Sequence, residues 1–389
     1  MKKILVWETH SMISGGQKMT LLISELLGAE NEFVYMIPGE GALSKELDRR
    51  KIPYHMLGDQ SMPAGVKGKS VIFRYAGLSL NAIAKALRII AKEKPDLIYA
   101  PGPAALPWSA ICGTLSNKPV IWHLHHVFLD NPTKKLINIF SNWRSVKKII
   151  AVSNCVGSQI ITSAGKRKVT VLYNPVDTEQ YSNGTAVNVR KEYPNLEVAS
   201  TENTITLGHI ALMQETKRQN IVIEVAFLLQ RKGYHCNIVF AGGTKNSEDE
   251  QYLLSLKKKV AEYHMENNVF FLGFRSDVPN VLACCNLVMI PSAFEGFPLA
   301  GLEANAAGLP VICANQGGSL EYAKVSKSGE IFRFDDAEDA ASAVIRCLEK
   351  YDYYASNAKN FAKKCSVANY KDNIYAILIG NKAHERNII

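Results

Sequence analysis

Two glutamates eight residues apart, Glu295 and Glu303, flank a turn whose composition suits binding of a diphosphate. Residues 291–303 read Pro-Ser-Ala-Phe-Glu-Gly-Phe-Pro-Leu-Ala-Gly-Leu-Glu, and we predict a helix that begins near Pro298 or Leu299. The backbone N–H groups and the positive dipole end of such a helix attract anions. Glu303 could then accept both hydroxyls of a ribose, and Glu295 could face a sugar beyond the phosphates. The alternative is that the two glutamates are ordinary solvated residues of a helix.

Two glycine pairs are further candidates for contact with a ligand. Gly15-Gly16 follows the first apolar run of the chain, and Gly242-Gly243 follows another apolar run in the second half. Because glycine has no Cβ, the backbone at such turns can approach a bound molecule closely. A tight strand-to-helix turn without a ligand is the alternative for both pairs.

Two imidazoles lie on one side of a predicted strand at Trp-His-Leu-His-His, residues 122–126. Alternate strand residues share a face, so His123 and His125 would be neighbours. A metal site needs further ligands, and the eight cysteines include no C-x-x-C pair. We therefore expect no bound metal and no disulfide framework.

The elements that position these residues form a repeating pattern of short apolar runs and longer helical segments. The runs are apolar throughout, which is typical of parallel strands covered on both faces. This pattern predicts doubly wound α/β domains. The predicted strands are residues 4–7, 33–36, 97–99, 120–122, 149–152, 205–207, 237–240, 269–272, 287–290 and 310–312.

The alternation stops in a polar stretch near the middle of the chain and then restarts. We predict a Rossmann-like domain over residues 1–178, a linker over 179–203, a second Rossmann-like domain over 204–365, and a helical tail over 366–389 that can cross back to the first domain. Ligands of such sheets bind at the carboxyl ends of the strands, so two domains would place a cleft between those ends.

The segment from Glu295 to Glu303 resembles the Glu-x7-Glu motif of family 4 of the retaining glycosyltransferases. Other segments resemble the same family: 271–274, 285–292, 307–312 and 317–321 in the second half, and 151–153 and 174–177 in the first. The resemblance implies the GT-B fold, in which two doubly wound Rossmann-like domains face each other across a cleft. It also implies an acceptor side in the N-terminal domain and a nucleotide-sugar site in the C-terminal domain.

The resemblance implies a role for each matching residue. Glu303 would hold the donor ribose, Glu295 would contact the donor sugar, and Lys217 would contact the diphosphate. His125 would lie near the sugar and the acceptor, and would complete a catalytic set with Glu295 and Lys217. The other donor-binding residues would be Gly15, Gly16, Arg218, Gly242, Gly243, Gly296, Phe297, Pro298 and Leu299.

Two positions depart from the family pattern. An arginine usually stands five residues before the phosphate-binding lysine, where this chain has Leu212, and Arg218 is a candidate replacement. An acidic residue often follows the family's histidine, where this chain has His126. The first departure leaves the phosphate clamp one cation short, and the second alters the acceptor side.

Positive charge is concentrated in the first half of the chain. Of a net charge of +9, residues 51–150 hold 14 Lys and Arg against 4 Asp and Glu. The stretch 134–148 mixes basic residues with Trp, Phe and Ile, a composition that suits an anionic membrane surface. Further cations in this domain are Lys67, Lys69, Arg74, Lys85, Arg88, Lys92 and Lys94. The alternative is a core helix with a solvated basic face.

The sequence lacks an apolar run of the ~18 residues that a membrane-spanning helix needs. The first apolar run is broken at Glu8 and is too short for a signal peptide. We therefore expect a cytoplasmic protein that attaches peripherally to the inner face of the membrane. Nucleic acid is not an expected partner, because no aromatic platform or basic recognition helix accompanies the charge.

These features predict a retaining, metal-independent glycosyltransferase that needs no cofactor. Its donor would be a nucleotide-sugar, by family frequency a UDP-sugar, and its acceptor a glycan or lipid-linked saccharide of a bacterial surface polysaccharide such as capsule or lipopolysaccharide. Two alternatives stay open: a sugar-nucleotide epimerase of the same fold, and an inactive glycan- or partner-binding subunit. The sequence selects neither the base and sugar nor the acceptor, the linkage or the oligomeric state.

Overall fold

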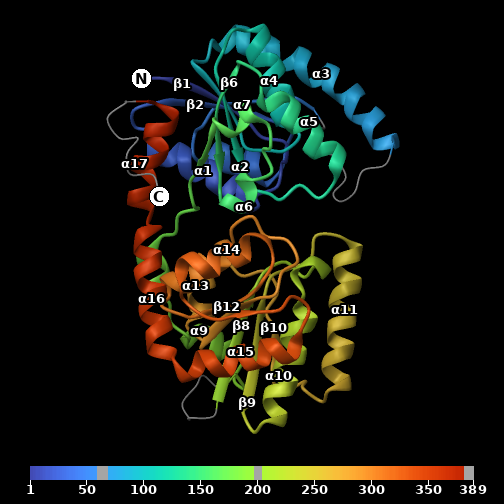
Figure 1. Cartoon of the computed structure of the whole chain (residues 1–389), viewed down its shortest axis with the longest axis vertical. Coiled ribbons are helices and arrows are strands. Elements are labelled where there is room, and N and C mark those ends of the chain that lie inside the picture. The colour runs from blue at the N-terminus through green and yellow to red at the C-terminus, as the bar shows by residue number, and fades with distance from the viewer. Residues whose placement is uncertain (59–68, 197–203, 381–389) are drawn as a thin grey trace. The chain divides into compact units, whose positions relative to one another are not determined.

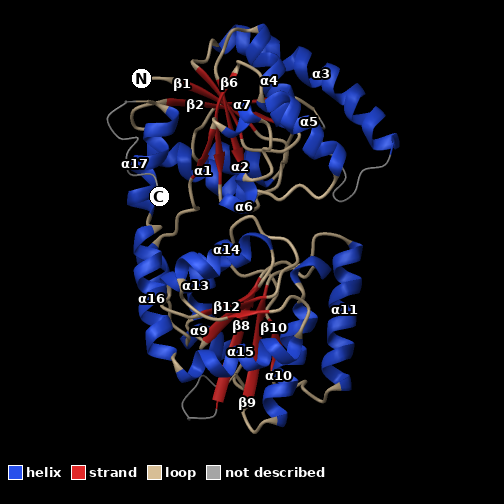
Figure 2. Cartoon of the chain, viewed as in Figure 1, coloured by secondary structure: helices blue, strands red, loops and turns tan. Residues whose placement is uncertain are grey.

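A computed structural model describes residues 1–58, 69–196 and 204–380. The chain forms two compact units, each built on one parallel sheet (Figure 1). Unit 1 comprises Met1–Asn174 and Tyr370–Ile389, and unit 2 comprises Pro175–Asn369. This confirms the predicted pair of doubly wound domains. Helices flank the strands of each sheet (Figure 2).

Unit 1 contains a seven-stranded sheet in the order β3-β2-β1-β4-β5-β6-β7. Its strands are β1 (Lys3–Trp7), β2 (Glu32–Ile37), β3 (Tyr54–Met56), β4 (Leu97–Ala100), β5 (Val120–Leu124), β6 (Val146–Ala151) and β7 (Val169–Val171). Its helices are α1 (Gly15–Leu27), α2 (Ala42–Arg49), α3 (Lys69–Glu93), α4 (Ala105–Leu115), α5 (Asn131–Ser141), α6 (Asn154–Gly157), α7 (Ser163–Lys166) and most of α17 (Val367–Leu378).

Alternate residues of β1 build the two faces of unit 1. Ile4 and Val6 are buried with apolar residues of α1, α2 and α17. On the other face, the Trp7 ring lies 6.0 Å from the Trp108 ring of α4, measured between centroids. The sheet is therefore covered on both sides, as its uniformly apolar strands require.

Unit 2 contains a six-stranded sheet in the order β10-β9-β8-β11-β12-β13. Its strands are β8 (Thr204–Ile210), β9 (His235–Ala241), β10 (Val269–Phe271), β11 (Leu287–Ile290), β12 (Val311–Ala314) and β13 (Ile331–Phe332). Its helices are α8 (Thr178–Ser182), α9 (Val187–Glu192), the 3₁₀ helix η1 (Glu215–Lys217), α10 (Gln219–Arg231), α11 (Ser247–Glu262), α12 (Val278–Leu282), α13 (Leu299–Ala306), α14 (Gly317–Ser326), α15 (Ala337–Glu349) and α16 (Tyr351–Lys364). In both sheets the strand order reverses beside the first strand, the arrangement that exposes loops for ligand binding.

The two compact units differ from the predicted division at the segment between the sheets. Within 179–203, predicted as a linker, the described residues include the end of α8 and all of α9, and both helices belong to unit 2. At the other end, α17 returns the chain to unit 1, where Tyr370 and Ile374 are buried in the core.

The basic stretch 134–148 is not one continuous helix. Helix α5 ends at Ser141, and Val146 begins strand β6, whose pairing with β5 determines the conformation of Lys147 and Lys148. Among the other predicted cations, Lys85 donates to the carbonyl of Leu57 at 2.8 Å. Lys67 lies outside the described residues.

Candidate active site

The carboxyl edge of the unit 2 sheet gathers the loops that carry most predicted donor-binding residues. Parallel strands end at the same edge, so the loops after β8, β9, β10 and β11 are neighbours. Backbone hydrogen bonds join them in pairs: Met213 to Gly243 at 2.9 Å, Gly242 to Gly273 at 2.8 Å, and Ala293 to Thr216 at 2.8 Å. These hydrogen bonds join the loops into one continuous surface.

Glycine is required at Gly242 by a close backbone approach. A Cβ there would lie 1.7 Å from the carbonyl oxygen of Ala211. The Gly242-Gly243 turn is thus explained by the packing of two loops, and a role in donor binding stays a prediction.

The turn before α13 is anchored on both sides. As predicted, the helix begins at Leu299, with Pro298 as its extended N-cap residue. The buried Phe297 ring packs edge-on against Tyr322, with centroids 5.3 Å apart. Inside the helix, a Cβ on Gly301 would lie 2.8 Å from that same tyrosine, so the helix approaches α14 closely. The first amides of α13 are therefore held at the end of β11.

Lys217 and Glu295 form an ion pair in this edge surface. Lys217 ends η1 and Glu295 lies in the loop before α13, and their Nζ and Oε1 atoms are 2.6 Å apart. Both side chains keep some exposure, 24% and 18%. The carbonyl of Glu295 also accepts from the N–H of Gly318 at 3.0 Å. Two residues 78 positions apart in the chain thus meet in one accessible charged pair.

Gly318 allows this close approach between the 291–298 loop and α14. A Cβ at residue 318 would lie 1.9 Å from the carbonyl oxygen of Gly296. The N-termini of α13 and α14 consequently lie beside the same short segment, Glu295 and Gly296.

Glu303 accepts a hydrogen bond from the hydroxyl of Tyr181, a residue of α8. Burial of the Tyr181 side chain raises its pKa, and the charge of Glu303 raises it further, so the phenol keeps its proton. The sequence analysis did not identify Tyr181. Its only signal is a position four residues after the matched segment 174–177.

The guanidinium of Arg218 contacts two residues of unit 2, Asp335 and Phe334. The backbone of Arg218 has a φ of 55° at the start of α10, the guanidinium Nε lies 3.7 Å from Oδ1 of Asp335, and the guanidinium stacks 5.5 Å above the Phe334 ring centroid. A role in place of the missing arginine stays a prediction.

His209, near the end of β8, is a second residue that sequence analysis did not identify. Its Nδ1 lies 2.9 Å from the carbonyl oxygen of Met289, and in the described structure its buried Nε2 has no hydrogen-bond partner. Burial lowers the pKa of His209 to about 4, and the nearby Lys217 charge also lowers it while Glu295 opposes this. A neutral imidazole therefore lies close to the Lys217–Glu295 pair.

The predicted residues of unit 1 form a separate group. Gly15 and Gly16 begin α1, and a Cβ on Gly16 would lie 4.0 Å from Cδ2 of His125, just after β5. The rings of His123 and His125 are 4.0 Å apart between centroids, and Nδ1 of His123 lies 2.5 Å from the hydroxyl of Tyr99. Burial lowers the pKa of His123 to about 3 and that of His125 well below its usual value. Both rings are neutral at pH 7.

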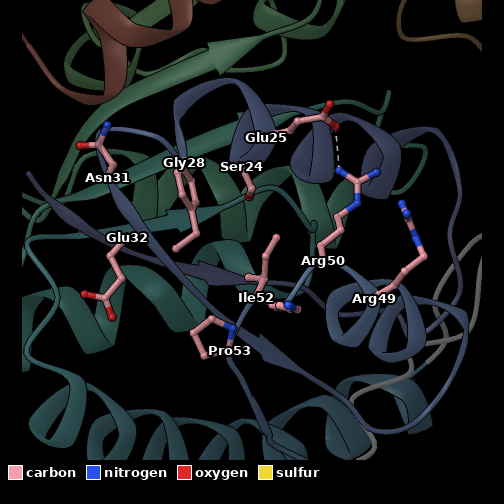
Figure 3. A pocket seen from close by; sticks show the side chains of 11 residues that line it. Ser24, Glu25, Gly28, Asn31, Glu32, Arg49, Arg50, Ile52 and Pro53 are labelled. Atoms are coloured by element: carbon pink, nitrogen blue, oxygen red, sulfur yellow. Dashed lines mark hydrogen bonds and ion pairs between the residues drawn. The ribbon is translucent and has the colours of Figure 1, made fainter.

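Among the residues that the structure describes, no three His, Cys, Asp or Glu side chains gather closely enough to hold a metal ion. A pocket of about 550 Å³ lies at the amino edge of the unit 1 sheet, between the ends of α1 and α2 (Figure 3). Its lining includes Arg49 and Arg50, and Arg50 is bound to Glu25 at 2.9 Å. None of the predicted site residues line this pocket.

Two family models match successive parts of the chain. The model described as Glycosyltransferase Family 4 matches residues 28–180, and the model described as Glycosyl transferases group 1 matches residues 196–364. The chain belongs to glycosyltransferase family 4. The predicted family is thereby confirmed, and the chain is a glycosyltransferase.

This family 4 glycosyltransferase is similar to bacterial enzymes of known activity. The UDP-Gal:alpha-D-GlcNAc-diphosphoundecaprenol alpha-1,3-galactosyltransferase of Escherichia coli is 23% identical over 362 residues, covering 89% of this chain and 88% of the relative. The capsular polysaccharide biosynthesis glycosyltransferase CapM of Staphylococcus aureus is 24% identical over 285 residues, covering 69% and 71%. Anabaena HepE, solved with UDP-glucose, is 24% identical with a TM-score of 0.80, covering 98% of this chain and all of that one. The structural likeness confirms the GT-B fold.

Proposed function

We propose that this glycosyltransferase moves a sugar from a UDP-sugar, with retention of anomeric configuration, to a glycan or lipid-linked acceptor in bacterial surface polysaccharide synthesis. The observation that carries the proposal is the Lys217–Glu295 pair, 2.6 Å long, at the loop that opens α13. Names of relatives that specify a UDP-sugar, a diphosphoundecaprenol acceptor and capsule synthesis support the donor and acceptor classes.

In this proposal Lys217 contacts the donor diphosphate and Glu295 contacts the donor sugar, so the ion pair joins the two parts of the donor site. An ammonium group has three donors, so Lys217 can hold Glu295 and a phosphate oxygen at the same time. The amides at the start of α13 add donors and the positive end of a helix dipole. A diphosphate bound to both would present its sugar to Glu295, and its nucleoside would extend toward Glu303, about one turn inside the helix.

Charge development in the reaction matches this arrangement. Cleavage of the bond between the anomeric carbon and the phosphate oxygen leaves negative charge on the diphosphate and positive charge on the sugar ring. Lys217 and the helix amides stabilise the leaving group, as preorganised donors do in other enzymes. In the proposed front-face reaction, the leaving phosphate oxygen accepts the proton of the attacking hydroxyl. Glu295 then orients the sugar, and neither a metal nor a cofactor takes part.

A panel of UDP-, GDP-, ADP- and dTDP-sugars tests the donor site by thermal shift. We expect a UDP-sugar to raise the melting temperature of the wild type and to have little effect on Glu303→Ala. Stabilisation of both proteins alike would contradict the assigned role of Glu303.

Turnover measurements test the reaction. We expect Lys217→Ala to lower kcat at least a hundred-fold with little change in melting temperature, because removal of a transition-state donor costs about 3–4 kcal/mol. We expect a comparable loss for Glu295→Ala, because misplacement of the sugar lowers the rate by a similar factor. Unchanged turnover in either variant would overturn the role of that residue.

Release of UDP that requires an acceptor separates transfer from epimerisation. The anomeric configuration of the product, determined by NMR, tests retention.

We also propose that unit 1 attaches to an anionic membrane surface. On helix α5 the side chain of Ile139 is half exposed, near Lys134 and Lys135. Ile161 is 67% exposed, and it lies beside α5 because its backbone N–H donates to Oδ1 of Asn138 at 2.7 Å. Among the described residues, no helix is both long and apolar enough to span a bilayer. Flotation with liposomes tests the proposal: preference for anionic over neutral lipid is expected, and equal recovery from both would remove it.

A further inference from the structure

The side chain of Glu8 is fully buried immediately after β1, in the N-terminal unit. Its backbone N–H donates to the carbonyl of Met36 at 2.9 Å, so the residue continues the pairing of β1 with β2. Burial raises the pKa of this carboxyl, while hydrogen bonds from Thr20, Gln17 and the Thr9 backbone oppose that effect. Burying a carboxyl is costly, and an apolar side chain at the same place would pack without that cost.

The carboxylate of Glu8 sets the orientation of Gln17. A carboxylate only accepts hydrogen bonds, so Nε2 of Gln17 must face it, and the two atoms are 2.8 Å apart. The Oε1 atom of Gln17 then faces Ser14, where it lies 3.2 Å from the backbone N–H and 2.6 Å from the hydroxyl. Ser14 is the N-cap residue of α1, so Glu8 fixes the entry of the chain into this helix.

A second contact joins Glu8 to Thr20, further along α1. The hydroxyl of Thr20 donates its single proton to Oε1 of Glu8 at 2.5 Å. Gln17 and Thr20 are 5% and 1% exposed, so both contacts are shielded from water. One carboxyl therefore holds Gln17, which accepts from the N-cap residue Ser14, and also Thr20, on the same helix.

We propose that Glu8 is a positioning residue that holds the Gly15-Gly16 turn in the geometry needed for substrate contact beside His125. The inference rests on the proposed function, in which this turn and His125 contact the substrates. Glycine leaves a turn conformationally free, and the hydrogen bonds to its flanks remove that freedom. Without the carboxyl, the amides at the start of α1 would lose their fixed direction while the sheet remained paired.

An exchange of the two side chains between positions 8 and 17 tests the role of the network. In Gln17→Glu, two carboxyls face each other in a buried site, and we expect faster amide hydrogen exchange over residues 14–20 and at least a ten-fold lower kcat. In the double variant Glu8→Gln/Gln17→Glu, the amide at position 8 donates to the carboxylate at position 17, which still accepts from Ser14. We expect the double variant to recover hydrogen exchange and kcat to within about three-fold of the wild type.

Ser24→Ala is the matched control. Ser24 is a buried hydroxyl of the same helix, but its partners are the carbonyl of Thr20 and the hydroxyl of Tyr35, away from the turn. We expect its kcat and the exchange over residues 14–20 to match the wild type. If Gln17→Glu does not fold, Thr20→Val removes the second contact of Glu8 at nearly constant volume and is expected to accelerate exchange in the same segment.

Two results would overturn the inference. One is a double variant that regains the melting temperature but neither kcat nor slow exchange, which would make Glu8 merely structural. The other is fast exchange in the turn with unchanged kcat. Hydrogen exchange is measured without substrate, so it tests whether Glu8 orders residues 14–20 independently of the proposed transfer reaction. Absence of wild-type transfer with every donor and acceptor would instead overturn the proposed function.

Discussion

The hydroxyl of Tyr181 fixes the carboxylate that we assign to the donor ribose. A carboxylate held by a neighbouring donor loses less conformational freedom when its ligand binds. We expect Tyr181→Phe to weaken UDP binding about ten- to hundred-fold, because a hydrogen bond to a charged group contributes roughly 1.5–3 kcal/mol. Titration calorimetry measures this, with the exposed Tyr353→Phe as control. Equal affinities for Tyr181→Phe and the wild type would show that Glu303 needs no support.

Neutral His209 makes stability depend on pH. Its pKa is about 4 in the folded protein and 6.5 ordinarily, so between these values the unfolded chain binds the extra proton. This contribution to stability is complete above pH 6.5 and is lost as the pH falls toward 4. The slope from one such proton is about 1.4 kcal/mol per pH unit at most.

His209→Asn isolates that contribution, because an amide can still donate to the carbonyl of Met289. We expect denaturant unfolding of this variant to show a shallower loss of stability between pH 6.5 and pH 4 than the wild type. Parallel curves for the two proteins would mean that His209 titrates normally.

Among the single residues of the site, those that belong to a motif could be predicted from the sequence, and those outside a motif could not. Glu295, Glu303 and Lys217 stand in segments that resemble a known family, so they were predicted. Tyr181 contacts Glu303, and His209 lies close to the Lys217–Glu295 pair, only because of the fold, and their positions in the sequence carry no spacing signal. In the sequence Glu8 only interrupts an apolar run, and its neighbours do not reveal that its carboxyl is buried.

Helices α13 and α14 position the Glu295–Gly296 segment from two sides. A methyl group on Gly318 would overlap the Gly296 carbonyl, with only 1.9 Å between the atoms. We expect Gly318→Ala to destabilise unit 2 by about 1–3 kcal/mol and to weaken UDP binding, because the loop must move away. Gly243→Ala is the stability control, since its Cβ would meet Phe274 at an ordinary 3.7 Å. Equal melting temperatures for the two variants would contradict this account of the loop.

The buried strands of both sheets could be predicted from the sequence. The ten apolar runs all correspond to strands, because a parallel sheet covered on both faces needs apolar residues throughout. The short strands β3, β7 and β13 were not predicted. They form edges of the two sheets, where burial is partial and the apolar signal is weak. The charge pattern of 134–148 is compatible with a membrane-facing segment or with a core helix that has a basic face, and it does not reveal that α5 ends at Ser141.

The last described helix completes the first unit of the molecule. Ile374 of α17 is fully buried in a core with Ile4 and Leu21, although hundreds of residues separate them in the chain. We expect Ile374→Ala to lower the stability of unit 1 by about 2–5 kcal/mol, as other large-to-small core changes do. Hydrogen exchange should accelerate in β1 and α1, and the exposed Lys371→Ala should leave it unchanged. Acceleration confined to unit 2 would contradict the assignment of α17.

The central claim is that the edge of unit 2 formed by Lys217 and the start of α13 binds the donor diphosphate. Calorimetric titration with UDP tests it most directly, on the wild type, Lys217→Met and the control Lys258→Met, whose ammonium is exposed on α11. We predict at least ten-fold weaker binding to Lys217→Met, a weaker dependence of its affinity on salt, and wild-type behaviour of the control. Equal UDP affinity for all three proteins would contradict the account.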